Sequence, residues 1–319
     1  MDAKRWFCLV LLTSLLAGCV QATPTPRPTL TPKPKNPLGE DVFRIALDSS
    51  GRIYSGWMRI FRLDDMSGAG MTFYTWIGIG GLNDVAVDAS GRIYAADCSN
   101  DQIVRMDDME GNNWVAYGTE GSGTGQWNQV GGIALDDSGR IYVTDWTNSR
   151  VVRIDDMTGS NWISYGSTGS GVGQFRGPEG IALDSSGRIY VADPENNRIV
   201  RFDDMTGKNW ISLDTSSVGI GTSAWAREVF VDAAGRIYIV AMMICCVVRF
   251  DDMTGANWIK LGSSCGLGKG QFGLPGGVAV DSAGRIYVGD FGDSTGRNGH
   301  IVRIVRVDDM NGTNWTTFP

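Results

Sequence analysis

The sequence predicts an all-β fold, a six-bladed β-propeller with four strands in each blade. One motif recurs along the chain at a nearly fixed period, each copy contains short β-branched runs, and Gly, Asn and Asp separate those runs. Gly-Arg-Ile-Tyr occurs six times, in steps of 40, 48, 48, 48 and 49 residues. Asp-Asp-Met marks a second point in each copy. A period of this length indicates repeated supersecondary units.

Each copy contains four candidate strands separated by turn residues. In the fourth copy these are GIALD (180–184), RIYVAD (188–193), NRIVRF (197–202) and NWISLD (209–214). No part of the repeat has a sustained helical period. Four strands in about 48 residues match one propeller blade, so six copies predict a closed ring over residues 38–319. The last copy supplies its own fourth strand, NWTTFP, which leaves the mode of ring closure open.

The repeat resembles a known family. The segment QFRGPEGIALDSSGRIYVADPENNRIVRF (174–202) resembles the NHL repeat, and the pattern is nearly complete at 126–154 and 271–304. It is weaker in the copies near residues 42 and 228. The resemblance implies a propeller, but propellers of this kind serve binding, sensing and several enzyme chemistries, so it implies no single function.

The N-terminus predicts export and lipid anchoring. A charged start, MDAKR, precedes an apolar run that is too short to span a membrane, and LAGC (16–19) resembles the bacterial lipobox. We expect residues 1–18 to be a signal peptide and Cys19 to be the lipidated first residue of the mature protein. The alternative is an ordinary secretory signal with an incidental cysteine.

A Pro/Thr-rich tether is predicted to follow the lipid site. Residues 19–37 alternate Pro with Thr, a composition that favours extended polyproline II over a packed core. This tether would hold the propeller off the membrane at some ~3 Å per residue. The predicted location is the bacterial cell envelope, lipid-anchored and outside the cytoplasm.

Charge restricts the partners. The chain has a formal charge of −7 and residues 1–37 carry +4, so the propeller carries −11. An acidic domain disfavours a nucleic-acid partner and electrostatic docking to anionic lipid. We therefore expect membrane contact through the lipid anchor only.

Four cysteines lie in the predicted propeller. They are Cys98, Cys245, Cys246 and Cys265, and we expect them in an oxidising compartment. One disulfide from the adjacent pair to Cys265 is a possibility, but spacing does not fix the connectivity.

Residues repeated in every copy are predicted to be scaffold. The Asp of each Asp-x-x-Gly-Arg turn accepts backbone hydrogen bonds, and the Gly takes a positive φ. The recurring Asn-Trp pair predicts packing between blades, since a buried indole removes ~150–250 Å² from water. The tryptophans are Trp114, Trp162, Trp210, Trp258 and Trp315, and Met71 takes their place in the first copy.

Function is expected where the copies differ, in the loops between second and third strands. Copies two to four have polar loops, whereas copy five reads AMMICC and copy one reads SGWMRI. By resemblance to other NHL propellers, these loops line one rim of the channel, with an apolar sector facing an acidic one. The candidate ligand-binding residues are Trp57, Asp97, Asp145, Asp193, Met242, Met243, Asp290 and His300.

Catalytic motifs are scarce. His300 is the only histidine, so the three-histidine zinc site of NHL-type amidating lyases is impossible here. Streptogramin lyases, a related propeller family, rely on a catalytic histidine, and that role would fall to His300. Six-bladed lactonases hold a calcium-type ion with Glu, Asn and Asp, and Asn83, Glu179 and Glu228 occupy comparable places before three first strands.

Two functional hypotheses follow. The first is a surface-tethered, monomeric, non-catalytic scaffold that needs no cofactor and binds a protein, peptide or glycan through its loop rim. The alternative is a metal-dependent hydrolase or lyase, lactonase-like or streptogramin-lyase-like, with Ca²⁺ in the central channel.

Overall fold

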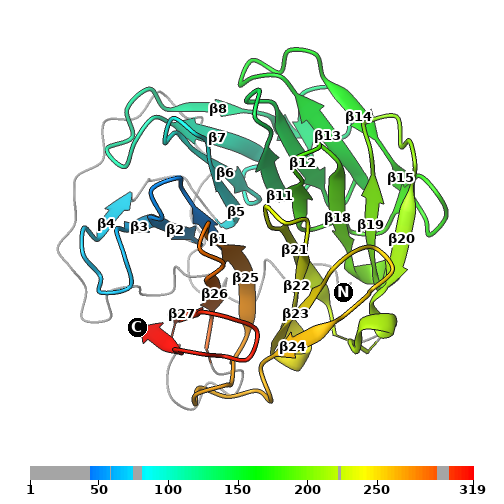
Figure 1. Ribbon diagram of the computed structural model, residues 1–319. Coiled ribbons are helices and arrows are strands. Elements are labelled where there is room, and N and C mark those ends of the chain that lie inside the picture. The colour runs from blue at the N-terminus through cyan, green and yellow to red at the C-terminus, as the bar shows by residue number, and fades with distance from the viewer. Residues whose placement is uncertain (1–43, 58, 75–80, 222–223, 293–301) are drawn as a thin grey trace, which may run out of the picture.

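The computed structural model describes residues 44–57, 59–74, 81–221, 224–292 and 302–319. Six four-stranded antiparallel sheets stand around a central axis, which confirms the predicted six-bladed propeller (Figure 1). In every sheet the four strands follow one another in chain order, so each blade is one contiguous segment. No helix in this part of the chain is long and apolar enough to cross a membrane. The predicted signal peptide, Cys19 and the tether lie outside the described residues.

The strands of the first three blades are as follows. Blade 1 contains β1 (Arg44–Leu47), β2 (Ile53–Gly56), β3 (Ile60–Leu63) and β4 (Thr72–Tyr74). Blade 2 contains β5 (Leu82–Val87), β6 (Ile93–Asp97), β7 (Gln102–Met106) and β8 (Val115–Tyr117). Blade 3 contains β11 (Val130–Leu135), β12 (Ile141–Asp145), β13 (Arg150–Ile154) and β14 (Ile163–Tyr165).

The remaining blades repeat this arrangement. Blade 4 contains β17 (Ile181–Leu183), β18 (Ile189–Asp193), β19 (Arg198–Phe202) and β20 (Ile211–Asp214). Blade 5 contains β21 (Ala226–Val231), β22 (Ile237–Ala241), β23 (Cys246–Phe250) and β24 (Ile259–Leu261). Blade 6 contains β25 (Pro275–Val280), β26 (Ile286–Asp290), β27 (Arg303–Val307) and β28 (Thr316–Phe318).

Short elements connect the blades and shape the loops. Two small parallel pairs form in the links: β9 (Thr119–Glu120) with β10 (Gln126–Trp127), and β15 (Ser167–Thr168) with β16 (Gln174–Phe175). The Gly-rich stretches at 121–127 and 169–175 belong to these links. Three 3-10 helices are present among the described residues: η2 (Pro194–Asn196), η3 (Thr215–Val218) and η4 (Met242–Ile244).

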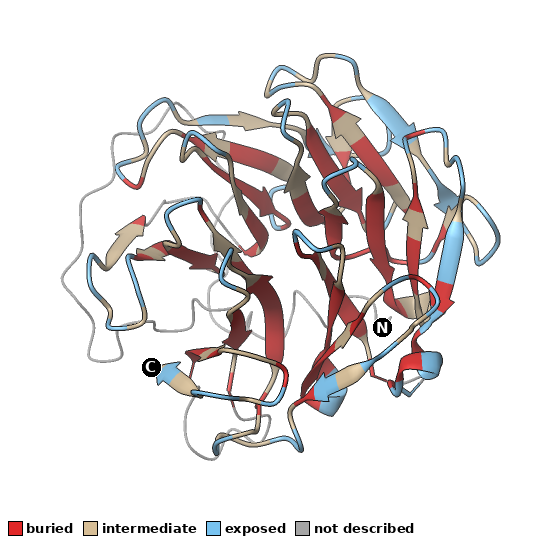
Figure 2. Ribbon diagram, in the orientation of Figure 1, coloured by how far each residue is buried: buried red, intermediate tan, exposed pale blue. Residues whose placement is uncertain are grey.

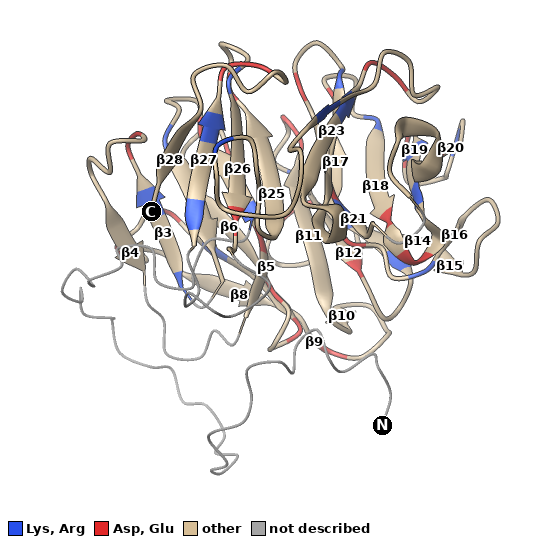
Figure 3. Ribbon diagram, turned by 90° about the horizontal axis from the view of Figure 1, so that it is seen from below, with Lys and Arg blue, Asp and Glu red and all other residues tan. Residues whose placement is uncertain are grey.

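The middle strands are buried on both faces because each blade is covered by two neighbours. All five residues of β18 are buried, and Figure 2 shows the same burial through the strands nearest the axis. A sheet with two covered faces favours near-continuous apolar runs, and the Ile-Tyr-Val-Ala run of β18 has that character. Viewed from the side, the charged residues gather mainly toward the strand ends and turns (Figure 3).

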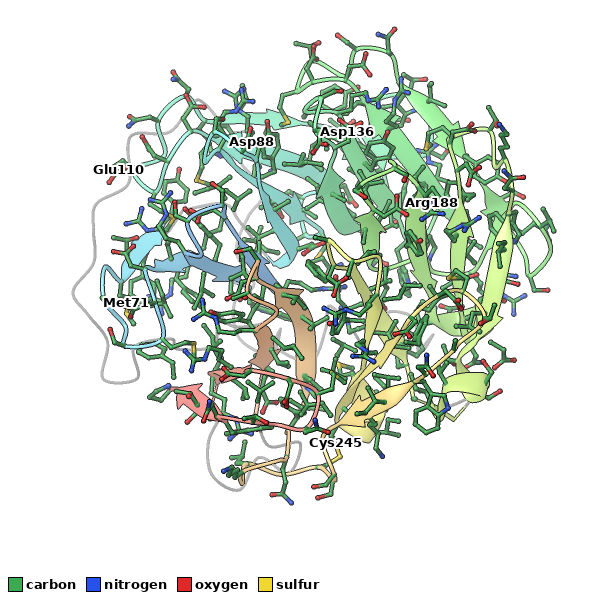
Figure 4. The ribbon with its side chains drawn as sticks, viewed as in Figure 1. Met71, Asp88, Glu110, Asp136, Arg188 and Cys245 are labelled. Atoms are coloured by element: carbon green, nitrogen blue, oxygen red, sulfur yellow. A yellow bond between two sulfur atoms is a disulfide. The ribbon has the colours of Figure 1, made fainter. Side chains whose placement is uncertain are left out.

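The repeated Asp-x-x-Gly-Arg turn is scaffold, as predicted. Asp184 Oδ1 accepts from the backbone N–H groups of Ser186 (2.9 Å) and Arg188 (3.0 Å). Its Oδ2 accepts from Arg188 Nε (2.6 Å) and from the Tyr190 hydroxyl (3.2 Å). Asp88, Asp136 and Arg188 mark three successive copies of this turn around the ring (Figure 4). One carboxylate therefore fixes the turn and ties it to its second strand.

The repeated tryptophans pack between blades but stay partly exposed. Trp210 stacks on Phe202 (centroids 5.6 Å apart, 12° between planes), and Trp162 lies 4.7 Å from Trp127. Met71 packs in the equivalent place in blade 1 (Figure 4). The packing role is confirmed, but Trp258 is 47 % exposed, so full burial of every indole is not observed.

Among the described residues, the first and last blades exchange no strand. β28 pairs with β27 of the same blade, and β1 is hydrogen-bonded to β2. Blades 1 and 6 meet through an apolar cluster that includes Ile45 and Phe61 from one side and Tyr287 and Ile304 from the other. Side-chain packing, rather than a shared sheet, therefore joins the first and last blades.

The disulfide connects Cys245 to Cys265, 20 residues further along the chain. It links the loop of blade 5 to the connection that leads into blade 6. Cys246 is buried and outside this bond, and burial raises the pKa of its thiol to about 11. The thiol of Cys98 donates to the carbonyl of Gly81 (3.1 Å).

Candidate functional site

The innermost strands carry an uneven set of side chains to the axis of the ring, where β1, β5, β11, β21 and β25 converge (Figure 1). One position lies four residues before the aspartate of each Asp-x-x-Gly-Arg turn. In the six copies it is Arg44, Asp84, Gly132, Gly180, Glu228 and Gly277. One residue earlier, copies two to six have Asn83, Gly131, Glu179, Arg227 and Gly276. At these two positions, some blades therefore have a charged side chain where others have glycine.

Bulges help place the charged residues. The register of β5 against β6 shifts between Leu82 and Asp84, and that of β21 against β22 shifts between Ala226 and Glu228. A bulge inserts an extra residue and re-aims side chains. Two consecutive polar residues can therefore contribute to the centre of the ring, where strict alternation would turn one away.

The glycines allow adjacent inner strands to approach closely. A methyl group on Gly180 would lie 2.8 Å from the Arg227 carbonyl oxygen, and one on Gly277 would lie 2.7 Å from Arg44 Cα. The N–H of Gly180 donates to the Arg227 carbonyl across this contact (2.9 Å). Any side chain here would push the neighbouring blade outward, so these glycines keep the central side chains within reach of one another.

A buried ion network results. The Arg44 guanidinium contacts the Glu228 carboxylate, although blade 6 lies between their blades. Arg44 Nη2 is also 3.9 Å from Glu179 Oε2, and Arg227 Nε is 2.9 Å from the same oxygen. Only 1 % of Arg44 is exposed. We name Arg44, Glu179, Arg227 and Glu228 the central ion network.

Neutral groups complete the network. Trp225 Nε1 donates to Glu179 Oε1 (2.9 Å), which connects an indole to the buried charges. Arg44 also donates to the backbone carbonyls of Asn83 (Nε, 3.1 Å) and Arg227 (Nη2, 3.4 Å). The guanidinium of Arg44 therefore bridges side chains and backbone from three blades.

Burial changes the protonation chemistry beside the network. Desolvation, reinforced by nearby Arg227, lowers the pKa of Arg44 to about 10, which still leaves it charged at neutral pH. Burial raises the pKa of Asp84, while Arg44 and two backbone donors oppose that rise. Asp84 accepts from the N–H groups of Val85 (2.8 Å) and Ile133 (2.9 Å), so its carboxylate also joins blades 2 and 3.

The three predicted metal ligands surround Arg44 but do not form a metal-binding set. The carboxylates of Glu179 and Glu228 are paired with guanidinium groups, and Asn83 donates its side-chain amide to the Val130 carbonyl (3.0 Å). Divalent cations take oxygen ligands, and two guanidinium groups beside those ligands repel a further cation. Within the described residues no cluster of three or more His, Cys, Asp or Glu side chains is arranged to hold a metal. These residues do not fit a calcium site.

The aspartates predicted to line the rim are buried inside their blades. Asp193 Oδ1 accepts from the N–H of Arg176 (2.8 Å). Its Oδ2 accepts from Asn196 Nδ2 and Arg198 Nε, both at 2.8 Å. Burial raises the pKa of each carboxyl, against the opposing effect of its hydrogen bonds. All four of the predicted rim aspartates have 0 % exposure: Asp97, Asp145, Asp193 and Asp290. They hold the loops in place, so the interpretation of them as an acidic ligand-binding sector is corrected.

Apolar side chains occur on the loops of blades 5, 6 and 1. Met243 is 48 % exposed and Ile244 is 36 % exposed, on the loop that is polar in copies two to four. Cys245 Sγ lies 3.0 Å from the Gly273 carbonyl, and Leu274 accepts from the N–H of Phe291 (3.0 Å). The ring of Phe291 is 5.8 Å from that of Trp57. We name Trp57, Met243, Ile244 and Phe291 the apolar rim.

One predicted rim residue, Met242, is not part of that surface, and another is not described. Met242 is 5 % exposed, and its Sδ accepts from Arg227 Nη1 (3.7 Å) beneath the loop. His300 lies outside the described residues. The sequence interpretation also missed Arg44 and Arg227. Aligning the six copies would have revealed them, because Arg44 aligns with Gly180 and Arg227 aligns with Gly131, so both are charged where other copies have glycine.

Comparison with known proteins agrees with the fold. The family model for the NHL repeat matches residues 128–154 and 175–202, in blades 3 and 4. The comparison with curated proteins gave no match. The chain is thus a six-bladed β-propeller that carries NHL repeats.

Solved structures resemble it at low sequence identity. Virginiamycin B lyase from Staphylococcus aureus aligns with a TM-score of 0.59 and 14 % identity, over 88 % of this chain and 84 % of that one. A gluconolactonase from Xanthomonas campestris gives 0.58 and 14 %, over 79 % and 85 %. A protein of unknown function from Bacteroides caccae gives 0.60 and 15 %, over 82 % and 90 %. At these identities the likeness concerns the fold alone.

Proposed function

We propose that this protein is a non-catalytic binding propeller, held at the cell envelope by lipid on Cys19, which presents its apolar rim to a protein, peptide or glycan. The exposure of Met243 and Ile244 carries the proposal, because exposed apolar side chains grouped on a loop mark interaction surfaces. The contact of Trp57 with Phe291 extends that surface with aromatic groups, which are enriched at interfaces. Propellers with NHL repeats commonly mediate protein interactions, in agreement with this role.

The experiment is site-specific cross-linking in living cells. A photoreactive amino acid at position 243 is expected to give a discrete cross-linked product. The matched control is the same residue at position 172, since Val172 is 76 % exposed but lies in a link between blades. The double variant Met243→Ser with Ile244→Ser should abolish the cross-linked product that forms when the photoreactive amino acid is placed at position 57. Products of equal yield from positions 243 and 172 would contradict a specific rim.

The anchor is tested separately. Labelled palmitate should enter the wild-type protein and be absent from Cys19→Ser, which should be released from the membrane fraction. Retention of label in the variant would contradict lipidation at this residue.

The alternative of a metal-dependent hydrolase or lyase has less support, because guanidinium groups pair with both predicted carboxylate ligands. A resident ion would raise the unfolding midpoint, since binding to the native state alone adds ~2.7 kcal/mol at a hundredfold excess over the dissociation constant. We expect no shift when Ca²⁺, Mg²⁺ or Zn²⁺ replaces EDTA. A rise with one ion that is lost in Glu179→Gln would revive the enzyme hypothesis.

A further inference from the structure

The outer edges of the blades repeat a contact between a glycine and a ring. The glycine belongs to the Asp-Asp-Met turn of one blade, and the ring comes from the last strand of the blade before it. Methyl groups placed on Gly111, Gly159 and Gly207 would overlap the rings of Tyr74, Tyr117 and Tyr165. Gly68 has the same relation to Phe318, whose ring would be 2.5 Å away. Four of the six turn glycines are therefore covered by an aromatic ring.

The two remaining copies replace the ring in different ways. The equivalent residues of blades 4 and 5 are Leu213 and Leu261, at the same register against the third strand. At blade 4 the helix η3 compensates, because Val218 would lie 2.8 Å from a methyl group on Gly255. At blade 5 no such insertion follows. The nearest atom to a methyl group on Gly312 would be Leu261 Cδ1, at 3.6 Å.

A hollow of about 480 Å³ occupies this place, and its lining combines residues of β24 with the turn that precedes β28. Its lining includes Leu261, Gly270, Gly312 and Trp315. In the preceding copies the tyrosine hydroxyl also meets a glycine of the link: Tyr117 Oη would be 3.1 Å from a methyl group on Gly125. The corresponding glycine here is Gly270, and a methyl group on it would meet nothing within 4 Å. In this copy Gly270 is thus uncovered, and a methyl group on Gly312 would only touch Leu261 and Trp315 (3.7 Å).

One cation borders the hollow. Lys269 directly precedes Gly270, and both residues belong to the lining. Copies two and three have Thr124 and Val172 at this place. Lys260 precedes Leu261 in β24, but it pairs with Val248, which packs toward blade 4, so its side chain leaves the opposite face of the strand. The positive charge of Lys269 is therefore specific to this copy, in a domain that is otherwise acidic.

We propose that this hollow binds a tyrosine side chain from an acidic segment of a partner protein. The ring would lie over Gly312 beside Trp315, as Tyr165 lies over Gly207, and the acidic neighbours of the tyrosine would pair with Lys269. Aromatic rings gain free energy from burial and from offset contact with other rings, and a complementary charge adds specificity. This site lies at the outer edge of the ring and is separate from the apolar rim.

The probe is a fluorescein-labelled pentapeptide, Glu-Asp-Tyr-Asp-Glu, titrated with the whole protein while anisotropy is measured. Saturable binding is expected. Replacing the peptide's Tyr by Leu, or its acids by Lys, should weaken binding at least tenfold. Leu261→Tyr should do the same, because the chain then supplies its own ring, and its circular dichroism and melting curve verify folding.

Charge is tested with matched variants. Lys269→Glu should weaken binding at least threefold, whereas Lys260→Glu, on the opposite face of β24, should not. Met243→Ser should leave peptide binding unchanged, so failure at this hollow is distinguishable from failure of the apolar rim. Absence of saturable binding, or equal binding by Leu261→Tyr, would overturn the proposal. Equal affinity for free 4-hydroxyphenylacetate would overturn the assignment to a peptide.

Discussion

Removing the positive charge at the centre of the ring should destabilise the protein strongly. Arg44→Met keeps most of the apolar volume but leaves the carboxylate of Glu228 buried without its partner. Breaking a buried ion pair from one side costs about 3–5 kcal/mol. The carbonyls of Asn83 and Arg227 also lose a donor, but water entering the widened axis can replace it. We expect a loss of about 4 kcal/mol in the free energy of unfolding.

The assay is equilibrium unfolding in urea, followed by both tryptophan fluorescence and circular dichroism to test two-state behaviour. Arg44→Met combined with Glu228→Gln should recover more than half of the loss, because the uncompensated charge is then removed. Arg52→Met removes an arginine whose side chain is 36 % exposed in an ion pair of the same blade, and it should cost no more than about 1 kcal/mol. A loss below about 1 kcal/mol for Arg44→Met, or no recovery in the double variant, would refute this account of the central ion network.

Three further predictions concern the scaffold. Gly180→Ala should lower the free energy of unfolding by about 2–4 kcal/mol, because its methyl group meets the backbone of β21. Gly221→Ala, which has open space around it, should be nearly neutral in the same urea assay. Equal effects of the two substitutions would contradict the argument from close approach. Cys265→Ser should cost about 3 kcal/mol, since the bond to Cys245 closes a loop of 20 residues, and reduction of the wild type should reproduce that loss. Asp136→Asn should cost about 1 kcal/mol at pH 7 and almost nothing near pH 2. Burial raises the pKa of Asp136, but the hydrogen bonds of its turn outweigh burial, so the pKa of the folded state lies below the ordinary value of 3.8. The ionised carboxylate therefore stabilises the fold above pH 3.8, and this stabilisation is lost as the pH falls through the folded-state pKa. A cost of Asp136→Asn that does not depend on pH would contradict this account.

The blades could be predicted from the sequence because their determinants are local and repeated. The strand GIALD (180–184) was expected and β17 covers 181–183, while RIYVAD (188–193) became β18 at 189–193. Turn chemistry set these limits, since an Asp, a Gly and an Arg within five residues satisfy one another's hydrogen bonds. The same repetition explains why scaffold roles were assigned correctly.

The site was less predictable because it depends on contacts between copies. Asp193 ends a strand and precedes polar residues, a pattern typical of an exposed loop, but the link before its own blade folds back and buries it. Arg44 and Glu228 are 184 positions apart, and only ring closure brings them together. Glu179 and Asn83 do approach the axis as expected, but the arginines that change their chemistry come from other blades.

Because every sheet is complete within one contiguous segment, the ring has no privileged starting point. In a propeller closed by strand exchange, the first and last segments complete one sheet, so the chain can begin only inside that blade. Here a circular permutant could open at a link between blades without dividing any four-stranded sheet. The period of about 48 residues is thus the length of chain that completes one sheet.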